Sequence, residues 1–167
     1  MKISDLFNLD AGKSKANDDY DLGDVPYVSS TTFNNGVLQF VEPYEDDKVF
    51  EGGSICVSGL GYATLQLNTF LPKGNGGDSA TILIPIKDMT IVELIFYTAS
   101  FNLLHTWRFS FGRKGNKTRI KDLEIPPFSE YNNKFNDEFE DLMKVFKTEI
   151  KHFGQILDTK PKKKASR

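Results

Sequence analysis

A dense group of cationic side chains lies in the segment FSFGRKGNKTRIKDLEIPPF, residues 109–128. Five lysines and arginines fall within nine residues: Arg113, Lys114, Lys117, Arg119 and Lys121. Long cationic side chains reach phosphates, and the glycines and asparagines between them let the backbone approach a ligand closely. The pattern therefore indicates contact with nucleic acid, although the tip of a solvated hairpin has the same composition.

Residues able to perform catalysis do not form a recognisable constellation. His105 and His152 lack metal-ligand spacing, and the loop KGNGGD lacks the Gly-Lys-Ser/Thr ending of a phosphate-binding loop. The tetrapeptide IPPF resembles the catalytic motif of DNA amino-methyltransferases, but that motif begins with Asp, Asn or Ser, and Ile125 cannot hold the target amino group. We therefore expect a protein that is not an enzyme and that carries neither a cofactor nor a metal.

The net charge of −2 hides an uneven distribution along the 167 residues. Residues 1–58 contain 4 Lys/Arg and 11 Asp/Glu and are acidic. Residues 59–121 contain 8 Lys/Arg and 3 Asp/Glu and are basic, whereas residues 122–167 contain 9 of each and are neutral. A globally acidic protein does not adsorb to DNA non-specifically, but a locally basic middle region can still bind DNA with its register fixed by specific contacts. The acidic first third is expected to face away from DNA or to meet a basic partner.

Composition and chain length indicate one globular domain with appendages in a cytoplasmic setting. No apolar run reaches the roughly 18 residues that span a bilayer, so no membrane partner is expected. The N-terminus contains acids and lacks the long apolar stretch of a signal peptide. The single cysteine, Cys56, lies in a strand-like run and is expected to be a buried structural thiol.

Most of the elements expected to position the basic residues are strands. Apolar or alternating runs predict strands over residues 27–29, 37–41, 54–58, 63–71, 80–86 and 107–111. Asn35-Gly36 is a hairpin signal between the first two strands, and Pro85 is expected to place the end of its strand at a sheet edge. Residues 10–26 are polar and predict a loop, and the segment 118–125 is expected to complete a final hairpin.

Two helices are expected, over residues 90–104 and 137–157. Thr90 is the predicted N-cap of the first, and Asn136 or Asp137 that of the second. The second helix has apolar residues spaced 4, 3, 4, 3, 4: Phe139, Met143, Phe146, Ile150, Phe153 and Leu157. This 3.5-residue seam favours a coiled coil, and the alternative is that it packs on the body of the same domain.

Strands followed by a terminal helix indicate the α+β class, with a mixed, mostly antiparallel, β-rich body and a C-terminal amphipathic helix. The order of short motifs then becomes informative. They are PYVSS at 26–30, NNGV at 34–37, VFEGGSICVSG at 49–59, TILIP at 81–85, FSFGR at 109–113 and RIKDLEIPP at 119–127. Over roughly residues 1–130 this order resembles the target recognition domain of type I restriction–modification specificity subunits, and equally the like domain of combined (type IIG) restriction–methylation enzymes.

The resemblance implies a non-catalytic prokaryotic or phage module that reads a half-site in the major groove of double-stranded DNA. Residues 1–130 would be the recognition domain and 131–158 a spacer-like helix, with 159–167 a basic disordered tail. In that family such helices pair and dock methyltransferase subunits, so a methyltransferase partner and a homodimer through the helix are expected. One recognition domain and one helix correspond to half of a full specificity subunit.

Candidate DNA-contacting residues follow from side-chain chemistry on the predicted loops. Cations would contact phosphate or guanine, and amides could read adenine edges. The set is Arg113, Lys114, Lys117, Arg119, Asn34, Asn35, Tyr62, Lys73 and Asn75. The alternative function is a protein-interaction module, a decoy subunit or inhibitor of restriction complexes, favoured by the acidic first third and the helix seam.

Overall fold

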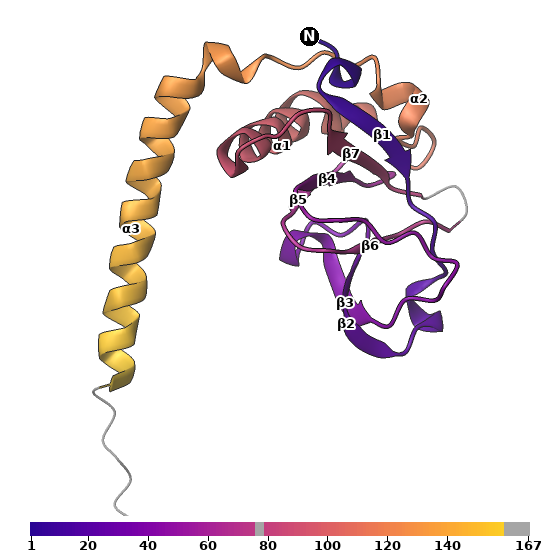
Figure 1. The fold of residues 1–167 in the computed structure, drawn as a ribbon, viewed down its shortest axis with the longest axis horizontal. Helices are drawn as coiled ribbons and strands as arrows, with labels where there is room; N and C mark the ends of the chain where they lie inside the picture. Colours follow the sequence, from indigo (N-terminus) through magenta and orange to yellow (C-terminus); the bar gives the residue numbers. More distant parts are fainter. Residues whose placement is uncertain (76–78, 159–167) are drawn as a thin grey trace, which may run out of the picture. The chain divides into compact units, whose positions relative to one another are not determined.

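The computed structural model describes residues 1–75 and 79–158, with side chains described only as far as residue 151. The chain divides into two units, Met1–Glu130 and Tyr131–Arg167. Strands dominate the first unit (Figure 1): β1 (Phe7–Ala11), β2 (Leu22–Val28), β3 (Val37–Val41), β4 (Ser54–Val57), β5 (Ala63–Gln66), β6 (Leu71–Pro72) and β7 (Thr81–Pro85).

Helices occupy the second half of the chain. The first unit contains α1 (Ile91–His105) and the single turn α2 (Lys117–Ile120), and the second unit contains α3 (Asn132–Asp158). Short 3-10 turns connect the elements of the first unit: η1 (Ile3–Asp5), η2 (Asn17–Asp19), η3 (Asn34–Gly36), η5 (Thr106–Arg108) and η6 (Phe128–Glu130).

The strands form two sheets. One has the order β1-β7-β4-β5 and is antiparallel throughout. The other has the order β3-β2-β6, in which β2 pairs antiparallel with β3 and parallel with β6. Together with the helices, these sheets confirm the predicted α+β class with mixed, mostly antiparallel strands.

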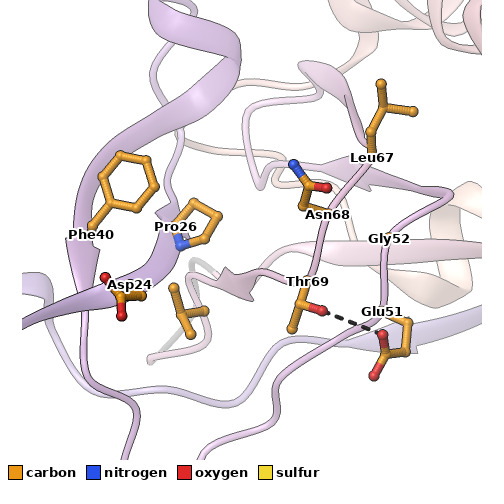
Figure 2. Close-up of a pocket in the computed structure, with 9 residues that line it drawn as sticks. Asp24, Pro26, Phe40, Glu51, Gly52, Leu67, Asn68 and Thr69 are labelled. Atoms are coloured by element: carbon orange, nitrogen blue, oxygen red, sulfur yellow. Dashed lines mark hydrogen bonds between the residues drawn. The ribbon is translucent and has the colours of Figure 1, made fainter.

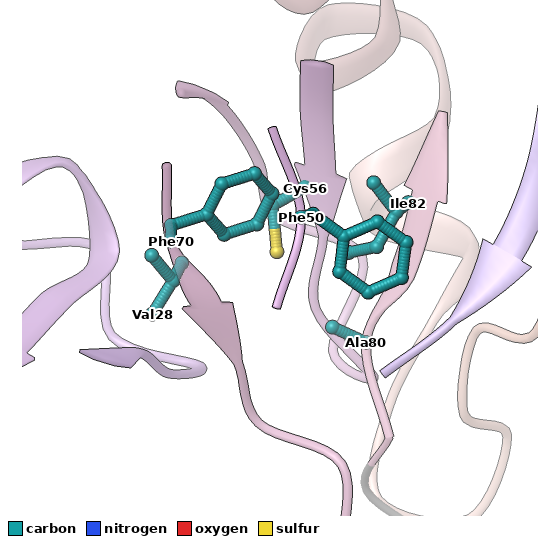
Figure 3. Packing of buried hydrophobic residues seen from close by; sticks show 6 residues of the cluster. All are labelled: Val28, Phe50, Cys56, Phe70, Ala80 and Ile82. Atoms are coloured by element: carbon teal, nitrogen blue, oxygen red, sulfur yellow. The ribbon is translucent and has the colours of Figure 1, made fainter. Parts of the chain in front are cut away.

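An apolar cluster holds elements of the two sheets together. Its buried members are Val28, Phe50, Cys56, Phe70, Ala80 and Ile82, whose side chains converge in Figure 3. Phe50 and Phe70 exchange two backbone hydrogen bonds of 2.9 Å, and their rings stack with centroids 6.0 Å apart. Burial of several aromatic and aliphatic side chains in one place is the main force that stabilises such a body.

Helix α1 begins as the sequence predicts. The Thr90 hydroxyl accepts a hydrogen bond from the backbone N–H of Glu93, while the Glu93 carboxylate accepts one from the backbone of Thr90. The helix covers the exposed edge of β5: the Asn102 side chain exchanges two 2.8 Å hydrogen bonds with the backbone of Ala63. An edge strand needs such cover, because its outward N–H and C=O groups lack strand partners.

Several strand predictions are correct in type but not in extent. The strand predicted over 54–58 is β4, whereas the run predicted over 63–71 is two strands, β5 and β6. β2 begins at Leu22, inside the segment predicted to be a loop. β7 is an interior strand rather than an edge strand. Pro85 lies beyond Leu83, the last residue of β7 that pairs with β4, so the missing N–H of Pro85 costs no hydrogen bond with β4.

The final hairpin predicted from the sequence is wrong. Residues 106–108 form η5, which follows directly on α1, and the Trp107 indole N–H donates to Leu104 O at 2.8 Å. The segment expected to be the return strand contains α2 and then pairs with the N-terminus through the bridge Lys2↔Glu124. Helix α3 begins at Asn132, four or five residues before the predicted N-cap.

Candidate nucleic-acid interface

The basic segment, residues 109–121, is anchored in the first unit at two points. Phe109 is buried and stacks on Phe101, with ring centroids 6.5 Å apart and planes at 3°. Gly115 is buried, and its N–H donates to Gly59 O at 2.8 Å. The residues between these anchors are therefore presented from a fixed base.

Two further interactions shape the basic segment. Ser110 and Arg113 exchange backbone hydrogen bonds of 3.1 and 3.0 Å, which close a tight turn. The Asn116 side chain caps α2 by accepting from the backbone N–H of Arg119 at 3.0 Å, and the Arg119 guanidinium donates to Lys114 O at 2.6 Å. Arg119 thus stabilises the loop, a role that sequence reasoning missed.

The cations of the segment differ in their freedom to meet a ligand. Lys117 Nζ lies 4.0 Å from Asp10, which also forms an ion pair with Lys48. Partial burial pushes the pKa of Asp10 upward. The hydrogen bonds from Lys48 and from the Ala11 backbone N–H, together with the charges of Lys48 and Lys117, outweigh it, so the pKa lies below its usual value. Arg113 is exposed, and its side chain has no hydrogen bond or ion pair with the described side chains, those of residues 1–75 and 79–151, or with their backbone.

The two candidate asparagines are engaged in the fold. Asn34 and Asn35 both have positive φ, 48° and 51°, which asparagine tolerates better than most residues. The Asn35 amide donates to Leu65 O at 2.7 Å, on the same edge of β5 that α1 covers, and the Asn34 amide donates to Val37 O at 3.3 Å. Each side-chain amide therefore donates one hydrogen bond within the protein. Reading an adenine edge would have to use the amide oxygen and the second N–H of each group.

The other three candidates lie on two loops. Tyr62 is 40% exposed in the β4–β5 turn, the turn that also holds the acceptor for Gly115. Lys73 and Asn75 follow β6, in a loop joined to the region after β1 by a 2.7 Å hydrogen bond from Gly74 N–H to the Ser14 hydroxyl. Tyr62 therefore lies near the basic segment, and the 73–75 loop lies near the end of β1, to which Lys117 is also tied.

The sequence was compared with models of known protein families. Residues 1–152 match the family described as "Type I restriction modification DNA specificity domain". The chain belongs to this family. The specificity-domain family is non-catalytic, in agreement with the prediction from the sequence.

Solved structures share the fold of this specificity domain at low identity. A type I restriction–modification S subunit from M. genitalium matches 95% of this chain with a TM-score of 0.59 and 15% identity. An HsdS subunit from Thermoanaerobacter tengcongensis matches 89% with a TM-score of 0.60 and 14% identity. A structure concerned with complex assembly and conformational transition of the type I R-M system matches 95% with a TM-score of 0.62 and 15% identity.

The specificity domain spans less than half of each of these chains, 43%, 38% and 42% of their lengths. A search of curated proteins returned no match. Among the side chains described, those of residues 1–75 and 79–151, no three His, Cys, Asp or Glu are grouped to hold a metal ion. No helix among these residues is long and apolar enough to cross a membrane.

Sequence reasoning did not anticipate the pocket drawn in Figure 2, whose lining residues include none of the basic segment. It has a volume of about 590 Å³, and β2, β3 and the residues around 51–52 and 67–69 line it. Phe40 and Leu67 supply apolar surface, while Asp24 and Glu51 supply carboxylates, the latter accepting a 3.3 Å hydrogen bond from Thr69. Two carboxylates repel phosphate, so this pocket does not extend the cationic surface of the specificity domain.

Helix α3 carries the predicted apolar seam. Phe139 is partly buried, whereas Met143, Phe146 and Ile150 are 37%, 52% and 70% exposed. The side chains of Phe153 and Leu157 lie outside the described residues. Exposed apolar side chains at heptad spacing are typical of a helix face that binds a partner, and the coiled coil itself stays a prediction.

Proposed function

We propose that the unit Met1–Glu130 recognises a half-site in double-stranded DNA and that α3 docks the methyltransferase subunit of a type I restriction–modification system. Family membership supports DNA recognition at the level of the family. The observation that carries the proposal for this chain is the anchored basic segment, which presents Arg113 to solvent without an internal partner among the described residues. An anchored backbone favours binding, because less of the loop has to be ordered when the ligand binds.

The segment's electrostatics favour a polyanion. No Asp or Glu occurs between Glu93 and Asp122, whereas six Lys and Arg lie in that interval. Neutralising phosphates with such side chains releases counterions, so the affinity for DNA would fall steeply with salt. Arg113 is the primary candidate, because Asp10 tethers Lys117 and the Arg119 side chain also stabilises the loop.

A titration with a fluorescent duplex tests the DNA-reading role. The full chain would select duplexes from a random-sequence library, and the selected duplex would then be titrated at several salt concentrations. Arg113→Ala should weaken binding about 5- to 150-fold if the guanidinium reads a base, or lower the salt slope by about 1 if it contacts phosphate. Lys87→Ala, which removes an exposed lysine after β7, is the matched control and should leave the affinity unchanged.

The docking role of α3 requires a separate measurement. Phe146→Glu places a charge on the exposed seam and should reduce capture of a type I methyltransferase subunit in a pull-down. Thr148→Glu changes an exposed residue two positions further along the same helix, roughly on its opposite side, and should leave capture intact. Light scattering of the full chain tests the proposed homodimer, which Phe146→Glu should dissociate.

The second candidate function is a protein-interaction module that acts as a decoy or inhibitor of restriction complexes. The acidic first third, with 4 Lys/Arg against 11 Asp/Glu, and the exposed seam of α3 favour it. Capture of the methyltransferase without any selected duplex would support this function and contradict DNA recognition.

A further inference from the structure

Phe111 is held in solvent at the end of a rigid turn. Its side chain is 82% exposed, although phenylalanine is normally buried. The backbone hydrogen bonds between Ser110 and Arg113 close the turn around Phe111 and Gly112. A Cβ atom added to Gly112 would meet nothing within 4 Å, so the turn projects into open space.

The base of this turn is fixed by burial. Phe109, two residues before Phe111, is 8% exposed and stacks on Phe101. On the other side of the turn, Gly115 is buried and bonded to the β4–β5 loop. An apolar side chain that a fixed base keeps in water is suited to a partner that encloses it, because little ordering entropy is lost on binding.

Cations accompany the exposed aromatic rings of this region. Lys114 Nζ lies 5.4 Å from the centre of the Phe111 ring. A second pair lies on η5, where Trp107 is 73% exposed and the Arg108 guanidinium is 4.7 Å from its ring. The interval between Glu93 and Asp122 contains six Lys and Arg and no acid, so the charge of this stretch of chain matches a polyanion that has apolar surface between its charges.

Duplex DNA has this chemistry, since phosphates line its outside and stacked bases form its apolar interior. Phenylalanine is among the side chains that proteins insert between base steps, which unstacks them and kinks the duplex. We propose that Phe111 is an apolar wedge that enters a base step of the bound duplex, while Arg113 and Lys114 contact the flanking phosphates. This inference rests on the proposed function and adds a DNA deformation to it.

The experiment uses the duplex selected by the full chain, with 2-aminopurine substituted at one position at a time. Insertion of Phe111 should raise the fluorescence at one step, and energy transfer between end-labelled strands should report a bend. Phe111→Ala should abolish both signals and weaken binding about tenfold, without changing the salt slope, because no charge is lost. Phe111→Leu keeps an apolar wedge and should retain most of each signal.

Leu22→Ala is the matched control, because Leu22 is 88% exposed at the start of β2 and should have no effect. Thermal unfolding of Phe111→Ala should match the parent protein, since an exposed side chain contributes little to stability. If Phe111→Ala bends and binds the duplex like the parent while Arg113→Ala weakens binding, the wedge is overturned and the proposed function stands. If the parent chain selects no duplex, both fail.

A protein partner at this turn would give a different result. Loss of methyltransferase capture by Phe111→Ala, with DNA affinity and 2-aminopurine signal unchanged, would assign the turn to a protein surface and overturn the wedge.

Discussion

Gly61 is expected to be a strict requirement for the position of the basic segment. Its φ is +82°, a conformation that residues with a Cβ atom rarely adopt. A Cβ atom at this position would lie 2.4 Å from Cδ2 of Phe109 and 3.0 Å from its Cβ and Cγ. Phe109 cannot move away easily, because it is buried and stacked on Phe101.

Gly61→Ala should therefore lower the free energy of unfolding through two separate costs. An alanine at positive φ costs about 1–2 kcal/mol. Forcing an extra methyl group into packed surroundings adds about 1–3 kcal/mol. The sum is about 2–5 kcal/mol, a large part of the stability of a domain of this size.

Gly53→Ala separates the two costs. Gly53 has a similar φ of +76°, but a Cβ atom added there meets nothing within 4 Å. This variant should lose only the backbone component, about 1–2 kcal/mol. The difference between the two variants then measures the clash with Phe109.

Urea unfolding, followed by far-UV circular dichroism and by the fluorescence of Trp107, gives the required free energies. Trp107 is the only tryptophan and lies two residues from Phe109, so it also reports on the local structure. In a Phe109→Ala background, which removes Cδ2 and Cγ and leaves only the Cβ contact at 3.0 Å, the difference in cost between Gly61→Ala and Gly53→Ala should shrink. Equal costs for the two alanine variants in the parent background would refute the reasoning.

Three further predictions concern the remaining polar and titratable groups. Burial lowers the pKa of His105 below its ordinary 6.5, and the hydrogen bond to Glu124 O only partly opposes this shift, so the folded state favours the neutral ring. The contribution of His105 to stability should be complete above pH 6.5 and should be lost as the pH falls through the pKa of the folded state. His105→Gln should flatten this pH dependence of the free energy of unfolding, measured by urea titrations at pH 7.5 and 5.5. Burial raises the pKa of the Cys56 thiol to about 12, so a disulfide reagent at pH 8 should label it only in denaturant, and rapid labelling of the folded protein would contradict its place in the core. Asn35→Gly fits the φ of 51° but loses the bond to Leu65 O, and urea unfolding should register a loss of about 1 kcal/mol.

Features with a local physical cause could be predicted from the sequence. Helix α1 begins at its predicted cap because Thr90 and Glu93 satisfy the first backbone groups within three residues of each other. The strand around Cys56 was recognisable because its apolar, β-branched run has one plausible conformation. The apolar seam of α3 follows from spacing alone.

Features decided by tertiary contacts could not be predicted. Residues 107–111 alternate aromatic and polar side chains as a strand does, yet the indole of Trp107 bonds back to α1 and Phe109 stacks on Phe101. The return segment pairs with the first residues of the chain, where Ile3 N–H donates to Leu123 O at 2.9 Å. No local pattern reports a partner more than a hundred residues away.

The same distinction determines how mutations of the basic segment should be interpreted. The sequence presents Arg113 and Arg119 as equivalent cations, but Arg119 donates to Lys114 O and so also maintains the loop, whereas Arg113 has no such bond among the described residues. A weaker affinity in Arg119→Ala therefore mixes a lost charge with a disturbed turn, and it should come with a lower melting temperature. Arg113→Ala should weaken binding at an unchanged melting temperature. Of these two arginines, Arg113 is therefore the one whose substitution directly tests the proposed contact between the basic segment and DNA.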